Sequence, residues 1–188
     1  MTKKIVLFDM DGVGWQYDKK LLRLAHERFG LPLYTPGDVT DFCTEILFPE
    51  EYRAKVDELS NETGFFRDLE PFPGAVAAMQ EALDHPDLEP FICTAPKRFT
   101  KNPHCTREKL ESVVEHLGHK WADRVIPTRN KTLVHGHVLI DDKPKVSGVH
   151  KPSWEHVYYD RPYNKVKDRH RITDWSTWKE VVFPILFP

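Results

Sequence analysis

The sequence predicts an α/β fold, a doubly wound parallel sheet with a small helical segment inserted after the first strand. Short apolar runs recur along the chain and are typical of strands that are buried on both faces. Helical patterns lie between most of them, and this alternation favours a parallel sheet with crossover helices. At 188 residues the chain has room for one main domain and an insertion.

Each element rests on its own local pattern. The predicted strands are Ile5–Phe8, Pro90–Cys93, Arg124–Ile126, Val138–Ile140 and His156–Tyr159. The predicted helices of the sheet domain are Gly74–Leu83, Arg107–Leu117 and Asp174–Val182. Gly118 is a good C-cap for the second of these helices, and Trp175 and Trp178 share one face of the third. We therefore expect these tryptophans and Trp154 to pack in the core.

The stretch between Trp15 and Leu69 follows a different pattern, with helices and loops but no convincing buried strand. Leu21–Phe29 and Pro49–Leu59 are its helix candidates. We predict a core domain of residues 1–14 and 72–188 and a helical cap of residues 15–71. An insertion after the first strand lies at the carboxyl edge of the sheet, where open α/β sheets bind ligands, and it can act as a lid.

Charge and cysteine usage exclude several classes of function. With 27 basic and 29 acidic residues the net charge is -2, which argues against a general polyanion-binding surface. Cys43, Cys93 and Cys105 form no C-x-x-C pair, as suits a reducing compartment. No signal sequence and no membrane-length apolar stretch is evident. We expect a cytoplasmic protein with no polynucleotide and no membrane partner.

Polar side chains follow the predicted strands at the point where each strand ends. They are Asp9, Asp11, Thr94, Lys131, Asp141 and Asp142. If they converge, the carboxylates supply the hard oxygen ligands that Mg²⁺ prefers. The lysine and the threonine hydroxyl can contact phosphate oxygens. Together these groups predict chemistry on a phosphoryl group.

The order D-x-D, T, K and D-D resembles that of the haloacid dehalogenase-like (HAD) phosphohydrolases. Further short sequence motifs extend the resemblance to the 5'(3')-deoxyribonucleotidases of that superfamily, over nearly the whole chain. These motifs include Gly64-Phe65-Phe66, Phe91-Ile92-Cys93-Thr94, Thr128-Arg129-Asn130-Lys131-Thr132, Leu139-Ile140-Asp141-Asp142-Lys143 and Pro152-Ser153-Trp154-Glu155-His156. The resemblance implies a Rossmann-like core of the HAD type with a cap.

The resemblance also implies catalytic roles. Asp9 is the expected nucleophile, which takes the phosphoryl group as an aspartyl-phosphate. Asp11 is the expected acid/base, because a deoxyribose alkoxide leaves poorly without a proton. Mg²⁺ is expected on the Asp9 carboxylate, the Asp11 backbone carbonyl and Asp142, with Asp141 supporting the metal's water ligands.

Substrate contacts follow from the same resemblance. Thr94 and Lys131 are expected to hold phosphoryl oxygens, and Lys101 is the candidate for a further phosphate-side lysine. Tyr17 and Phe42 are the expected cap aromatics of a nucleoside pocket, which could disfavour a ribose 2'-hydroxyl left without a partner.

One segment departs from the family. Gly14-Trp15-Gln16-Tyr17 stands where the family usually has Leu-Ala-Asp-Phe, so Trp15 and Tyr17 are expected to add bulk at the mouth of the site. This departure leaves base and sugar preference open.

The predicted function is a Mg²⁺-dependent phosphohydrolase of deoxyribonucleoside 5'(3')-monophosphates, with dUMP and dTMP as the substrates implied by resemblance. The alternatives are a phosphatase of another small ester or of a nucleic-acid 3'-phosphate, and a non-catalytic nucleotide-binding module. A homodimer is retained as a candidate assembly. The basic run from Arg161 to Arg171 is interpreted as a solvated face.

Overall fold

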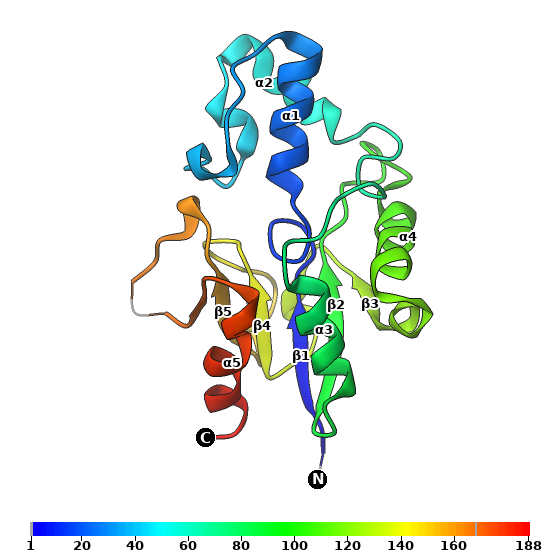
Figure 1. The fold of residues 1–188 in the computed structure, drawn as a ribbon, viewed down its shortest axis with the longest axis vertical. Helices are drawn as coiled ribbons and strands as arrows, with labels where there is room; N and C mark the ends of the chain where they lie inside the picture. Colours follow the sequence, from blue (N-terminus) through cyan, green and yellow to red (C-terminus); the bar gives the residue numbers. More distant parts are fainter. Residues whose placement is uncertain (1, 168) are drawn as a thin grey trace.

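The computed structural model describes residues 2–167 and 169–188 and contains a six-stranded parallel sheet (Figure 1). The strands are β1 (Lys4–Phe8), β2 (Leu88–Thr94), β3 (Val125–Pro127), β4 (Val138–Asp141), β5 (Glu155–Tyr159) and β6 (Arg171–Ile172). Their order is β3-β2-β1-β4-β5-β6, so the order reverses beside the central strand β1. Sheets of this kind bind ligands outside the carboxyl ends of the strands at that switch point.

Five of the strands were predicted, and β6 was not. With two residues, β6 is too short for any hydrophobic period to appear in the sequence. It is recognisable only by its pairing, since Tyr158 and Tyr159 of β5 lie beside Arg171 and Ile172.

The helices are α1 (Tyr17–Phe29), α2 (Glu50–Leu59), α3 (Ala75–Asp84), α4 (Cys105–Leu117) and α5 (Trp178–Leu186). Helix α5 begins later than predicted, because Trp175–Thr177 forms a 3-10 turn whose N-cap Asp174 accepts a hydrogen bond from the Ser176 backbone N–H. Within the described part of the chain, none of the helices has the length and apolar character needed to span a bilayer.

The main core lies between one face of the sheet and the helices α3 and α5, which stand in front of the sheet in Figure 1. Alternate residues of the central strand, Val6 and Phe8, are fully buried there. The rings of Trp175 and Trp178 pack against Phe8, with centroids 5.9 Å and 6.3 Å away. The predicted packing role of the C-terminal tryptophans is confirmed.

The segment between β1 and α3 carries α1 and α2, which stand beyond the carboxyl ends of the strands (Figure 1). The chain enters and leaves this segment at adjacent points. Trp15 forms a bridge with Pro71, and the Gln16 backbone N–H donates to the Glu70 carbonyl at 2.9 Å. This pairing supports the proposed division into a core and a cap of residues 15–71.

Trp15 does not add bulk at the mouth of the site. Its side chain is fully buried in the main core, next to His116 of α4. The expectation for Trp15 was therefore wrong: the chain turns between Asp11 and Trp15 and directs the indole inward. Tyr17, two residues later, does reach the cavity described below.

Candidate active site

The parallel register brings the predicted polar groups to one edge of the sheet. Phe8 lies beside Ile92 of β2 and Ile140 of β4, so the residues that follow these positions emerge at one level. The Asp9 backbone N–H donates to the Ile140 carbonyl at 2.9 Å, which fixes Asp9 next to Asp141. The predicted convergence of the strand ends therefore occurs.

The turn after β1 depends on a glycine. Gly12 has a φ of +74°, in the left-handed region that side chains disfavour. A Cβ there would lie 2.1 Å from the Asp142 Oδ2, a distance that no packed structure accepts. Gly12 thus allows the first carboxylate loop and Asp142 to approach each other closely.

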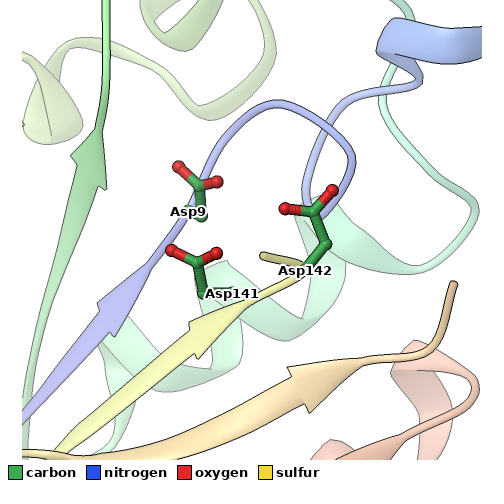
Figure 2. A group of neighbouring side chains, drawn as sticks. All are labelled: Asp9, Asp141 and Asp142. Carbon is green, nitrogen blue, oxygen red and sulfur yellow. The ribbon is translucent and has the colours of Figure 1, made fainter. Parts of the chain in front are cut away.

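Asp9, Asp141 and Asp142 form a cluster of carboxylates around one point (Figure 2). One oxygen from each lies within 4.8 Å of the others, and all three residues are buried. The Lys131 ammonium donates to Asp9 Oδ1 at 2.7 Å and to Asp141 Oδ2 at 2.5 Å. Lys131 comes from the 3-10 turn Lys131–Leu133, which the Asn130 side chain caps.

Burial dominates the electrostatics of this cluster. It raises the pKa of Asp9 to about 6, although the adjacent Lys131 lowers it. Burial and the charges of Asp141 and Asp9 raise the pKa of Asp142 well above its ordinary value. For Lys131, burial alone lowers the pKa, but the Asp141 and Asp9 carboxylates outweigh it and keep the lysine charged.

Three carboxylates that share one ammonium leave an excess of negative charge in a buried place. A bound cation would relieve that repulsion, and hard divalent cations take carboxylate oxygens as ligands. The donor set and its spacing therefore fit a metal ion. Asp141 has both oxygens occupied, by Lys131 and by the Lys143 backbone N–H, which suits a supporting position better than a direct ligand.

Lys109 is a site residue that the sequence reasoning missed. Its side chain is 1% exposed, and its ammonium contacts Asp11 Oδ2 and, at 2.9 Å, the Thr94 Oγ1. Lys109 lies on the buried stripe of α4 together with Cys105 and Val113. A lysine at a core position of an amphipathic helix is the signal that could have identified it, because lysine is almost never buried without a partner.

Thr94 occupies the end of β2 but does not line the cavity directly. It is 1% exposed, and its hydroxyl accepts the hydrogen bond from Lys109. Thr94, Lys109 and Asp11 thus form one chain of polar contacts.

A cavity of about 440 Å³ opens between this edge of the sheet and the cap. This volume is within the range of small-molecule sites in proteins. Asp9, Asp11, Lys131, Asp141 and Asp142 line its inner end. Its aromatic lining consists of Tyr17, Phe42, Phe66 and Tyr163.

The two predicted cap aromatics both reach the cavity. The Tyr17 ring stacks on Phe66 with centroids 6.2 Å apart, and it meets Phe65 edge-on. Phe42 is 45% exposed and meets Tyr163 edge-on with centroids 5.8 Å apart. The structure therefore places Tyr17 and Phe42 where a nucleoside pocket was expected.

Lys101 is not brought to the cavity. It lies at the surface, where its ammonium pairs with Glu58 at 3.1 Å, and it is not among the lining residues. Lys97, four residues earlier, lines the cavity and pairs with Asp57 of α2 at 2.8 Å. The loop after β2 turns back at residues 98–102, so the sequence alone did not show which lysine of the loop reaches the cavity.

The basic run after β5 is not a uniform solvated face. Arg161 is 6% exposed and forms a buried ion pair with Asp18, in the first turn of α1. Thr44 of the cap also donates to Asp18, at 2.6 Å. The interpretation of Arg161 was wrong because its partner lies 143 positions away in the sequence.

Comparisons with known proteins agree with this architecture. A family model described as "5' nucleotidase, deoxy (Pyrimidine), cytosolic type C protein" matches residues 3–185. The cytosolic-type 5'(3')-deoxyribonucleotidase of Homo sapiens is 40% identical over 190 residues, which cover 94% of this chain and 92% of the relative. The mitochondrial 5'(3')-deoxyribonucleotidase of Homo sapiens is 33% identical over 191 residues, which cover 94% and 81%.

Solved structures of HAD hydrolases share the fold. One, from Deinococcus radiodurans with bound phosphate and sodium, has a TM-score of 0.57 at 14% identity and covers 97% of this chain and 96% of its own. Another, from Bacillus subtilis and bound to magnesium, has a TM-score of 0.56 at 11% identity, with coverage of 97% and 99%.

Proposed function

This chain belongs to the 5'(3')-deoxyribonucleotidase family of HAD-like hydrolases, and on that premise we propose that it removes phosphate from deoxyribonucleoside 5'(3')-monophosphates with Mg²⁺ as cofactor. The observation that carries the proposal is the inner end of the cavity. Asp9 and Asp11, two residues apart, line it together with Lys131 and the Asp141-Asp142 pair. A binding module has no need of a nucleophile and a separate acid.

In the proposed first step, an Asp9 carboxylate oxygen attacks phosphorus. The bond between phosphorus and the sugar oxygen breaks, the Asp11 carboxyl gives its proton to that oxygen, and the nucleoside leaves. Lys131, which contacts Asp9 Oδ1, offsets negative charge on the phosphoryl group during the transfer.

In the second step, Asp11 takes a proton from a water molecule, whose oxygen attacks the aspartyl-phosphate. The bond from phosphorus to Asp9 breaks and phosphate is released. The Asp11 Oδ1 supports this role, because it is buried and has no hydrogen-bond partner among the described residues. A buried oxygen of this kind is satisfied when substrate or water supplies the partner.

Metal binding is assigned to Asp9, Asp142 and the Asp11 backbone carbonyl, with Asp141 in support. Mg²⁺ is proposed because the donors are all hard oxygens, and a bound Mg²⁺ would neutralise charge on the phosphoryl oxygens. Thr94 supports the phosphate end indirectly: its hydroxyl accepts a hydrogen bond at 2.9 Å from Lys109, whose ammonium also contacts Asp11.

The cap end of the cavity is proposed to take the nucleoside. The rings of Tyr17 and Phe42 provide apolar faces for a base and sugar. The half-exposed position of Phe42 suits a ring that a bound base would cover. Uracil and thymine deoxynucleotides are the first substrates to test, following the pyrimidine named in the family description. The free cysteines support a reducing compartment such as the cytoplasm.

Phosphate release from a panel of deoxy- and ribonucleoside monophosphates, 5' and 3', tests the proposal. Each is assayed with Mg²⁺ and with a chelator. The expected result is release from deoxynucleotides that the chelator abolishes. If no nucleotide in the panel releases phosphate, the assignment of a nucleotide substrate is overturned. If the chelator leaves the release unchanged, the proposed requirement for Mg²⁺ is overturned.

A further inference from the structure

The turn after β5 carries Tyr163, a side chain that contacts both ends of the cavity. Tyr163 lies in the 3-10 turn Pro162–Asn164 and lines the cavity. Its hydroxyl donates to the Asp142 Oδ2. Its ring meets Phe42 of the cap edge-on, with an interplanar angle of 85°. One residue of the core therefore contacts both a candidate metal ligand and an aromatic wall of the nucleoside end.

The same turn holds the backbone of Asp142. The Asn164 side-chain amide donates to the Asp142 carbonyl at 2.7 Å and to the Tyr159 carbonyl at 2.8 Å. The Asn164 Oδ1 in turn accepts from the Arg171 guanidinium at 2.7 Å. Both the main chain and the side chain of Asp142 are thus fixed by residues 163 and 164, so the turn has little freedom to move relative to the carboxylate.

The Asp142 carboxylate is held in one orientation. A Cβ on Gly12 would lie 2.1 Å from the Asp142 Oδ2 and 3.3 Å from the Tyr163 Oη, so this oxygen is enclosed between Gly12 and Tyr163. One oxygen of Asp142 points toward Asp9 and Asp141 in Figure 2. A hydrogen bond to one oxygen of a ligating carboxylate decides how the other faces the ion.

We propose that Tyr163 is a positioning and specificity residue: its hydroxyl orients Asp142 for the metal ion, and its ring forms the core-side wall of the nucleoside pocket. The first role needs only a metal at the carboxylate cluster, whereas the second rests on the proposed function. No polar group other than the hydroxyl is needed for the first role. The ring alone is sufficient for the second, since aromatic faces pack on bases and sugars through apolar contact.

Two variants separate the roles. Tyr163→Phe removes the hydroxyl and keeps the ring, and Tyr163→Leu removes both. Tyr158→Phe is the matched control, because the Tyr158 hydroxyl donates to the Pro144 carbonyl at 2.8 Å and has no hydrogen bond to a carboxylate of residues 2–167 or 169–188. Thermal unfolding without metal checks that each variant is folded. Titration calorimetry with Mg²⁺ alone gives the metal Kd, and KM for dUMP is measured at saturating Mg²⁺.

The expected result is a split between the two variants. Tyr163→Phe should weaken Mg²⁺ binding about tenfold, the lower end of the effect of losing an outer partner of a metal ligand, while KM stays that of the wild type. Tyr163→Leu should also raise KM for dUMP about fivefold, since it loses the ring contact. Tyr158→Phe should match the wild type in both measurements.

An unchanged metal Kd in Tyr163→Phe, or an equal loss in Tyr158→Phe, would overturn the positioning role. A wild-type KM in Tyr163→Leu would overturn the pocket wall. If the wild-type enzyme hydrolyses no nucleotide, the proposed function and the pocket wall fail together. The metal titration still decides the positioning role in that case, because it uses no substrate.

Discussion

The two ends of the cavity are built in different ways. At the phosphate end, Asp9 follows β1 and Asp141 ends the adjacent strand β4, so backbone pairing within one sheet places them side by side. At the cap end, the walls come from segments distant in the sequence and are held by side-chain contacts, such as Asp18 with Arg161 and Asp57 with Lys97. The sheet fixes the positions of these carboxylates through its backbone, whereas the cap end depends on side-chain contacts that a few substitutions can remove.

The largest effect is expected from Asp9→Asn, which touches only the phosphate end. An amide is a poor nucleophile, so phosphate release should fall on the order of 10⁴-fold or more. Urea unfolding should show no loss of stability, because the substitution relieves repulsion among buried carboxylates. Near-normal turnover by a folded Asp9→Asn variant would rule out the covalent mechanism.

At the cap end, Arg161→Met is expected to affect stability, whereas Asp9→Asn affects turnover. Removing one partner leaves the Asp18 carboxylate buried and unpaired, which should lower the free energy of unfolding by roughly 3 kcal/mol. The matched control is Lys19→Met on the neighbouring residue of α1, whose exposed pair with Glu70 should contribute less than about 1 kcal/mol. Urea unfolding followed by circular dichroism measures both.

The double variant Asp18→Leu with Arg161→Met should recover part of that loss, since no charge remains unpaired. If Arg161→Met costs no more than Lys19→Met, the buried pair does not hold the cap to the core.

Lys109→Met tests the residue that joins Asp11 to Thr94. Without its ammonium, Asp11 loses the contact that orients it, and kcat should fall about 10²-fold, the lower range for general acid catalysis. Lys101→Met is the comparison, since the structure places that lysine at the surface with Glu58. Steady-state kinetics of the two variants decide between the lysines. A larger loss of kcat in Lys101→Met than in Lys109→Met would favour Lys101 as the phosphate-side lysine that the resemblance implied.

The smallest effect concerns pH and metal binding. Burial raises the pKa of Asp9 to about 6, so protons compete with the metal for this carboxylate below that pH. As pH falls from about 7 to 5, the Mg²⁺ Kd should rise at least about tenfold, because the raised pKa of Asp142 adds to the competition between protons and the metal. Calorimetric titration across this range measures it. A Kd that does not change down to pH 5 would mean that Asp9 is ionised throughout or does not bind the metal.

Much of the molecule followed from local patterns, and the failures have specific causes. The apolar run before Asp9 predicted a buried strand that ends at the site, and β1 is present there. Lys101 was misplaced because the loop after β2 turns back on itself, and a register inside a loop has no periodic signal. Arg161 was misjudged because its charge looked solvated until its partner on α1 was known.

The sequence by itself predicted where the candidate site lies. Its carboxylates lie at or just after the ends of buried strands, and parallel strands bring their carboxyl ends to one edge of the sheet. The tertiary structure alone decided which distant side chains support the site and the cap. Lys109, Arg161 and Tyr163 contact residues distant in sequence, and only the folded chain brings those partners together.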